Sequence, residues 1–224
     1  MKIAGIQKTS TVDFPGKLAA VLFTVGCNYN CFYCHNRHLL QKPTLLSERE
    51  ARAFLKKRAG LLDGVVLSGG EPTLQKDLGD CAAFLKGLGY CVKLDTNGSD
   101  PDTVERLLLA GLLDYVAVDY KVPFDRYADL TGGDGAAVRE TVRLLAGHQT
   151  DWELRTTLIP QIAPDDLKRM AQEVPELPRY ALQQYHVQEG DTRFLKGLLP
   201  YTPAQIRALA EGIRAWQPNV LVRC

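Results

Sequence analysis

The sequence predicts an α/β fold with parallel strands, and two observations carry that prediction. Apolar, β-branched runs alternate with amphipathic segments along the 224 residues, strand before helix, six times. The apolar runs are nearly continuous, as expected of strands that are covered on both faces of a parallel sheet. The expected strands are residues 18–25, 64–68, 90–95, 115–119, 152–159 and 180–187.

Start signals predict the helices between these strands. Ser47 and Glu50 have the spacing of a capping box. Pro101 and Pro203 each follow a residue that favours the N-cap position, and proline is common in the first turn of a helix. The expected helices are residues 51–59, 102–110, 135–146 and 165–174, and one from Thr202 to about Trp216.

Six strand–helix units are fewer than the eight of a complete barrel. Periodicity alone leaves two alternatives, an open doubly wound sheet and a partial barrel, and both bind ligands at the carboxyl ends of their strands. The chain shows no repeat, low-complexity tract or long linker, so we expect residues 1–224 to form a single domain.

Composition excludes several classes of protein. Hydrophobic residues make up 46% of the chain and charged residues 24%, which excludes a disordered or collagen-like chain. The net charge of +1 gives no global field for nucleic acid or for an anionic membrane, and we expect neither as a partner. The longest apolar run, residues 18–25, is too short to span a bilayer, and no signal peptide is evident. We therefore expect a cytoplasmic protein with reduced thiols.

The strongest chemical signal is a C-x3-C-x2-C loop formed by Cys27, Cys31 and Cys34. Spacings this short let one loop place three thiolates around a single centre, and soft thiolates select iron–sulfur clusters, zinc or copper(I). His35 adjoins Cys34 and is a poor geometric choice for a fourth ligand. Three cysteines without a fourth favour a 4Fe-4S cluster with one open iron over a structural zinc site. The alternative, three buried small hydrophobes, fits poorly with this asparagine-rich loop.

Other polar groups follow the expected strands. The second strand leads into Gly69-Gly70-Glu71-Pro72, where bare backbone allows close approach of a ligand and a carboxylate can accept a bond from an ammonium group. The alternative is a glycine-rich turn without a ligand.

Three further groups leave their role open. Asp95-Thr96-Asn97-Gly98 has the composition of a simple turn. Asp119 and Lys121 are two residues apart and share one face of a regular strand, so they form either an ordinary ion pair or a site for a zwitterion such as methionine. His186 is either a core histidine or a ligand-binding residue, and Arg155 either points inward or forms a structural salt bridge.

Two of these motifs together resemble the radical S-adenosylmethionine (SAM) superfamily. They are the C-x3-C-x2-C loop with Tyr33 before its last cysteine, and the GGEP sequence at residues 69–72. The resemblance implies a partial (βα)6 barrel with parallel strands. It also implies a 4Fe-4S cluster whose open iron binds the amino and carboxylate groups of SAM. One electron then cleaves SAM to methionine and a 5′-deoxyadenosyl radical.

Two more motifs resemble the activating enzymes of glycyl-radical enzymes, including those of pyruvate formate-lyase and anaerobic ribonucleotide reductase. They are TVDFPG at residues 11–16 and Cys34-His35-Asn36, and the resemblance spans about residues 5–190. It implies hydrogen abstraction from a glycine of a partner glycyl-radical enzyme, which we expect to be anaerobic ribonucleotide reductase. No further C-x2-C cluster is present, so we expect an external flavodoxin- or ferredoxin-type electron donor.

The resemblance also assigns site residues. It implies that Lys121 meets the methionine carboxylate and that Asp95 and Asp119 bind a monovalent cation. Tyr185-His186 resembles a tyrosine–histidine pair whose histidine contacts the methionine moiety, although glutamines replace the usual leucine and proline before it. No catalytic side chain is expected beyond the cluster and SAM. The expected SAM-binding residues are Tyr33, Gly69, Gly70, Glu71, Pro72, Asp95, Asn97, Lys121 and His186.

Two alternative functions stay open at this point. A radical SAM enzyme of similar size that acts on a small molecule, such as 7-carboxy-7-deazaguanine synthase, can share the cysteine loop and the GGEP motif. Residues 11–16 and Cys34-His35-Asn36 favour the activating enzymes. The remoter alternative is a non-catalytic zinc-binding module, which would lack the broad visible absorbance of an iron–sulfur protein.

Overall fold

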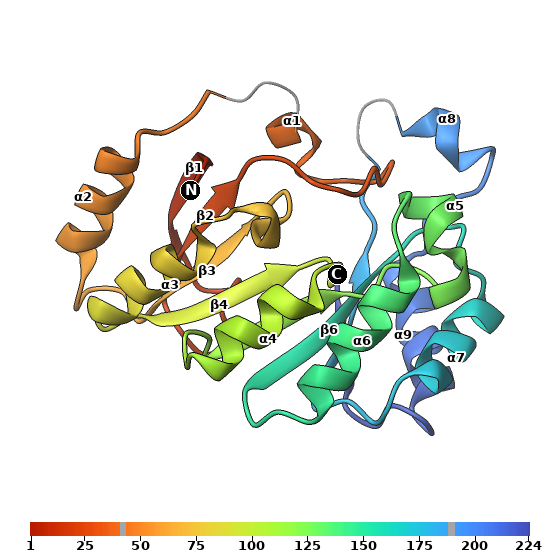
Figure 1. Ribbon diagram of the computed structural model, residues 1–224. Coiled ribbons are helices and arrows are strands. Elements are labelled where there is room, and N and C mark those ends of the chain that lie inside the picture. Colours follow the sequence, from red (N-terminus) through yellow and green to blue (C-terminus); the bar gives the residue numbers. More distant parts are fainter. Residues whose placement is uncertain (41–43, 188–190) are drawn as a thin grey trace. The chain divides into compact units, whose positions relative to one another are not determined.

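The structure is a computed structural model that describes residues 1–40, 44–187 and 191–224 (Figure 1). The chain divides into two compact units. The first unit comprises Met1–Asn28, Asn36–Thr96 and Asp102–Ala117. The second comprises Tyr29–His35, Asn97–Pro101 and Val118–Cys224. The expectation of one domain over residues 1–224 stays a prediction.

Strands of the first unit follow one another in sequence order. They are β1 (Ile3–Ser10), β2 (Ala19–Thr24), β3 (Gly64–Gly69), β4 (Cys91–Thr96) and the first residues of β5 (Tyr115–Asp119). Pairs β2–β3 and β3–β4 are parallel, with Gly64 opposite both Ala19 and Cys91. The predicted strands from β2 to β5 are therefore confirmed within one or two residues. Strand β1 is not predicted, and it runs antiparallel to β2.

Helices of the first unit connect these strands. They are α2 (Glu48–Arg58), α3 (Leu78–Gly87), α4 (Pro101–Leu109, which begins at the last residue of a second-unit segment), and the short α1 (Arg37–Leu40) and η1 (Pro72–Leu74). Ser47 caps α2 with both bonds of a capping box, as the sequence predicts. Helix α3 is not among the predicted helices, and Asp77 at its N-cap position makes no side-chain capping bond.

Phe14, within the TVDFPG segment, belongs to the core of the first unit. Its side chain is 2% exposed and packs with Ala19, Val66 and Tyr115. A Cβ atom added to Gly64 would lie 2.9 Å from the Phe14 ring. Ala19 and Gly64 are the first residues of β2 and β3, so Phe14 closes the amino ends of these strands.

The second unit repeats the alternation. Its strands are the last residues of β5, β6 (Asp151–Leu158), β7 (Tyr180–Gln184) and β8 (Val220–Arg223), and β6–β7 and β7–β8 are parallel. Its helices are α6 (Gly135–Ala146), α7 (Pro164–Glu173) and α9 (Pro203–Ile213), with the short η2 (Phe124–Arg126), α5 (Tyr127–Thr131) and α8 (Thr192–Leu195). The fold class, α/β with parallel strands, is confirmed.

Two ends in the second unit differ from the predictions by about three residues, and one strand is unpredicted. Strand β7 stops at Gln184 rather than residue 187, and α9 stops at Ile213 rather than Trp216. Strand β8 is not predicted. Its Arg223 pairs at 2.7 Å with Glu153 of β6, whose side chain is 1% exposed. Among the described helices, none is both long enough and apolar enough to cross a membrane.

Candidate functional site

The expected site residues fall in both units, and most follow the carboxyl end of a strand. The first unit contains Cys27, Gly69, Gly70, Glu71, Pro72 and Asp95. The second contains Cys31, Tyr33, Cys34, Asn97, Asp119, Lys121 and His186. Each group has its own hydrogen bonds and charges.

In the first unit, the turns after β2 and β3 pack backbone against backbone. The Gly70 N–H donates to the Thr24 carbonyl at 2.9 Å, and the Glu71 N–H donates to the Gly26 carbonyl at 2.8 Å. A Cβ atom on Gly70 would lie 1.9 Å from the Gly26 oxygen. Gly69 adopts a φ of +116°, which side chains rarely tolerate. These glycines are therefore required for chain packing, and this packing fixes the backbone just before Cys27.

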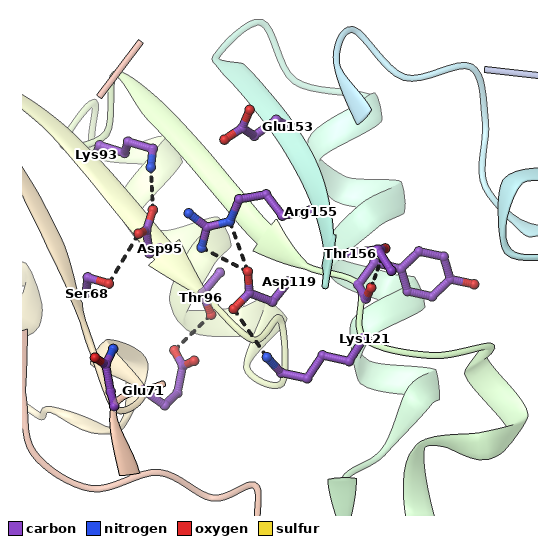
Figure 2. Close-up of polar contacts among 12 residues, drawn as sticks. Ser68, Glu71, Lys93, Asp95, Thr96, Asp119, Lys121, Glu153, Arg155 and Thr156 are labelled. Carbon is purple, nitrogen blue, oxygen red and sulfur yellow. Dashed lines mark hydrogen bonds and ion pairs between the residues drawn. The ribbon is translucent and has the colours of Figure 1, made fainter. Parts of the chain in front are cut away.

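Glu71 connects the GGEP turn to the end of β4. Its side chain is fully buried. Its Oε1 accepts hydrogen bonds from the Thr73 N–H at 3.1 Å and the Thr73 hydroxyl at 2.8 Å. The same oxygen accepts a hydrogen bond from the Thr96 hydroxyl at 2.8 Å (Figure 2). The carboxylate thus caps η1, whose first residue is Pro72. Sequence reasoning misses this internal role, although the Glu-Pro-Thr spacing is an N-cap signal.

Two amide side chains fix the segments on either side of the cysteine loop. The Asn36 Nδ2 donates to the Gly69 carbonyl at 3.1 Å, and the Gln75 Nε2 donates to the Val25 carbonyl at 2.9 Å. Asn36 thereby joins the end of the Cys-His-Asn motif to the GGEP turn. Gln75 carries no sequence signal, because its partner is a backbone carbonyl.

Asp95 has a cationic neighbour on its own strand. The Lys93 Nζ lies 2.5 Å from the Asp95 Oδ1, and the Ser68 hydroxyl donates to the Asp95 Oδ2 at 3.2 Å (Figure 2). Lys93 is 1% exposed. Sequence reasoning overlooks Lys93, although its spacing of two residues from Asp95 places both side chains on one face of β4.

The second unit contains two cysteines of the loop, and the charge of Lys121 acts on one of them, Cys31. Cys31 is buried, and Cys34 is half-buried. Burial raises the pKa of the Cys31 thiol, and the positive charge of Lys121 opposes part of that increase. The Tyr33 ring packs edge-on against Phe32, with ring centroids 5.2 Å apart. Burial also raises the pKa of the Tyr33 phenol, so this group stays neutral.

Asp119 forms ion pairs with two cations. Its Oδ1 lies 2.9 Å from the Arg155 Nη2, and its Oδ2 lies 3.2 Å from the Lys121 Nζ (Figure 2). Burial alone would raise the pKa of Asp119, but Arg155 and then Lys121 outweigh burial and lower the pKa to about 2. The ion-pair alternative is therefore present in the structure, and recognition of a zwitterion stays a prediction.

Asn97 and His186 occupy local settings that the sequence left open. The Ser99 N–H donates to the Asn97 Oδ1 at 2.9 Å, and Gly98 has a φ of +75°, so this segment does form a turn. His186 is exposed beyond the end of β7, which contradicts the core-histidine alternative. Partial burial of the His35 ring lowers its pKa, and the positive charge of His186 lowers it further.

The thiol set fits an iron–sulfur cluster in its chemistry. None of Cys27, Cys31 and Cys34 forms a disulfide, so all three can serve as thiolate donors for iron. Across residues 1–40, 44–187 and 191–224, no three His, Cys, Asp or Glu side chains converge on a common metal position. Cys27 lies in the first unit and the other two in the second, so the ligand geometry stays a prediction.

Comparison with known proteins identifies the family. A family model described as the radical SAM superfamily matches residues 21–174. The chain belongs to the radical SAM superfamily. Family membership implies an enzyme that uses a 4Fe-4S cluster and SAM. It also makes a non-catalytic zinc-binding module an untenable alternative.

Two curated relatives match this radical SAM protein along nearly its whole length. A protein of Methanocaldococcus jannaschii named as a glycyl-radical enzyme activating enzyme is 34% identical, over 99% of this chain and 95% of the relative. The pyruvate formate-lyase-activating enzyme of Listeria monocytogenes is 27% identical, over 98% of this chain and 92% of the relative. The resemblance to activating enzymes is therefore confirmed.

Solved structures of other proteins share the fold of this chain. Streptococcus suis SuiB aligns with a TM-score of 0.73 and 14% identity, covering 91% of this chain and 49% of SuiB. A domain of a pyruvate-formate lyase-activating enzyme from Bacteroides vulgatus aligns with a TM-score of 0.56 and 17% identity, covering 72% of this chain and 99% of that domain. These similarities agree with the expected partial (βα)6 barrel.

Proposed function

We propose that this radical SAM enzyme activates a glycyl-radical enzyme by removing a hydrogen atom from the Cα of one glycine in that partner. The observation that carries the proposal is the 34% identity over 99% of the chain to a relative named for this activity. When bound, the cluster supplies one electron that cleaves SAM to methionine and a 5′-deoxyadenosyl radical. The residues of this chain bind, orient and shield these reactants.

The cluster would be held by Cys27, Cys31 and Cys34. Lys121 supports this assignment, because a cation beside Cys31 favours the thiolate form that iron requires. The packing of Gly70 on Gly26 supports it as well, since this contact fixes the backbone that leads into Cys27. We propose that Cys81, Cys91 and Cys224 take no part.

SAM would lie along the GGEP turn, with its methionine carboxylate at Lys121. The ion-paired group of Asp119, Lys121 and Arg155 combines one negative and two positive side chains, and this surplus positive charge favours a bound carboxylate. Glu71 would position the turn through its Oε1, which accepts three hydrogen bonds, and would also contact SAM. The other proposed SAM-binding residues are Tyr33, Gly69, Gly70, Pro72, Asp95, Asn97 and His186.

The substrate would be a glycine-bearing loop of a partner, which we propose to be anaerobic ribonucleotide reductase. Glycine has no side chain to hinder approach of its Cα to the radical carbon. The TVDFPG segment gives little support for a protein partner, because its Phe14 packs in the core at the amino ends of the strands. We propose a cytoplasmic enzyme that takes its electron from a flavodoxin or ferredoxin.

Electron paramagnetic resonance tests this proposal. The reconstituted enzyme is incubated anaerobically with SAM, a reductant and either anaerobic ribonucleotide reductase or pyruvate formate-lyase. We expect a glycyl-radical signal on the reductase, its loss in Cys31→Ala, and its retention in Cys81→Ala. Cleavage of SAM without a radical on any partner, together with conversion of a small molecule, would favour the deazaguanine-type alternative.

A further inference from the structure

The family resemblance places a monovalent cation between the carboxylates of Asp95 and Asp119, and the structure provides a test of whether such a cation fits. Each carboxylate can be judged within its own unit, from the cationic side chains that already contact it. A carboxylate that attracts a metal cation carries negative charge that the protein itself has not neutralised.

Asp95 is already neutralised by Lys93. The ammonium group lies 2.5 Å from the Asp95 Oδ1, in a pair whose side chains are only 2% and 12% exposed. The Lys93 Nζ also lies 5.7 Å from the centroid of the Tyr115 ring, whose face attracts cations. A metal ion bound at Oδ1 would need the position that this ammonium occupies, and it would be repelled by it at short range.

Asp119 is neutralised in the same way inside the second unit. Arg155 contacts one of its oxygens and Lys121 the other, at 2.9 and 3.2 Å. Neither carboxylate of the expected cation site therefore carries uncompensated charge. The donor set does not fit a monovalent metal cation.

We infer that the Lys93 ammonium is a built-in counter-cation, which holds the Asp95 carboxylate in place at the end of β4 and replaces the monovalent metal ion. Lys93 is a positioning residue, and it acts on SAM binding only through Asp95. Lys93 can be recognised in the sequence, because this lysine stands two residues before the aspartate of the Asp-Thr-Asn-Gly segment. The inference goes beyond the proposed function, since it applies whatever substrate the enzyme takes.

The test compares potassium, sodium and N-methylglucamine chlorides at one fixed ionic strength. The reconstituted enzyme is examined for its thermal unfolding midpoint and its affinity for SAM. We expect the wild type to give the same values in all three salts. Lys93→Met, whose side chain ends one atom short of the ammonium position, removes the ammonium group from the Asp95 carboxylate. We expect a lower midpoint and about tenfold weaker SAM binding in N-methylglucamine, both restored by potassium or sodium.

Two further variants separate charge from packing. Lys86→Met removes the ammonium of a more exposed pair, in which the Lys86 Nζ lies 2.8 Å from Asp114, and should create no preference for alkali cations. The double variant Lys93→Met/Asp95→Asn removes both buried charges, so it should fold without responding to the type of cation.

Three results would overturn the inference. They are a wild type that gains stability or SAM affinity from alkali cations specifically, a folded Lys93→Met that ignores them, and misfolding of both Lys93→Met and the double variant. If Lys93→Met alone fails to fold and the double variant folds, the inference is supported, because the two variants differ only in the charge at position 95. No partner protein takes part, so these outcomes are independent of the activating function.

Discussion

Single residues in this structure carry structural and functional constraints at the same position. Gly70 is part of a motif that suits a ligand's approach, yet the structure shows a second reason for glycine there. Its missing side chain lets the turn after β3 rest on the Gly26 carbonyl. The sequence predicts the residue type and its place at the end of a strand. The contact partner depends on how two turns meet in space, which the sequence pattern does not encode.

Gly70→Ala tests the interlocked turns. The new Cβ would lie 1.9 Å from the Gly26 oxygen, a backbone atom, so the segment leading to Cys27 must move. We expect a loss of about 1–3 kcal/mol in the free energy of unfolding, measured with denaturant, and reduced iron loading. Gly87→Ala is the control, because its Cβ meets nothing within 4 Å and it lies at the end of α3. Equal stability and iron content in the two variants would contradict the account.

Glu71→Ala tests whether the buried hydrogen bonds of the Glu71 carboxylate stabilise the fold. The substitution leaves the Thr73 N–H, the Thr73 hydroxyl and the Thr96 hydroxyl without their buried acceptor. We expect the free energy of unfolding to fall by about 2–3 kcal/mol. Glu71→Gln keeps an acceptor oxygen and should lose less. A SAM affinity that collapses while stability is unchanged would instead assign Glu71 to the ligand alone.

At the scale of elements, local signals decided which helices and strands could be predicted. The capped helix α2 is predicted within a few residues, and α3, whose N-cap residue makes no side-chain bond, is not predicted. A cap is not the whole signal, because α7 is predicted although Ala163 at its N-cap makes no such bond. Continuous apolar strands were equally clear. Strand β1 was missed because most of its residues are partly or fully exposed, and β8 because it has only four residues. Pairing with neighbouring strands stabilises both, and such pairing is invisible in a local pattern.

Ser47→Ala measures how much the N-cap hydroxyl of Ser47 stabilises α2. The Ser47 hydroxyl accepts from the Glu50 N–H at 3.2 Å at the start of α2. Removing this acceptor should lower the free energy of unfolding by about 1 kcal/mol. Ser47→Thr retains the oxygen and should stay close to the wild type in the same denaturant titration. Equal effects of alanine and threonine would show that the cap does not stabilise α2.

At the scale of the whole molecule, the α/β order of the sequence predicts that the chemical groups lie at the carboxyl ends of strands. The sequence does not show which of these charged side chains are neutralised by partners that lie far away along the chain. The sequence offers Lys121 as an ion-pair partner of Asp119, but it does not show that Arg155 of β6, 36 residues further along the chain, also pairs with Asp119. Contacts between residues so distant in sequence follow from the order of the strands, not from any motif.

The pH dependence of stability reports on this Asp119 group. Its pKa falls from the ordinary 3.8 to about 2, so the carboxylate stabilises the folded state above pH 4 and loses that effect as the pH falls toward 2. The difference in unfolding free energy between the wild type and Asp119→Asn should therefore be constant above about pH 5 and shrink between pH 4 and 2. A difference that does not change across this range would show that Asp119 is not held ionised by its neighbours.

Transfer of deuterium from a partner protein tests the central claim most directly. Anaerobic ribonucleotide reductase labelled with deuterium at glycine Cα is incubated with the reconstituted enzyme, SAM and a reductant, and the 5′-deoxyadenosine is examined by mass spectrometry. The account predicts that 5′-deoxyadenosine gains deuterium as the glycyl radical appears on the partner. Rapid formation of unlabelled 5′-deoxyadenosine, with no radical on the labelled partner, would contradict it.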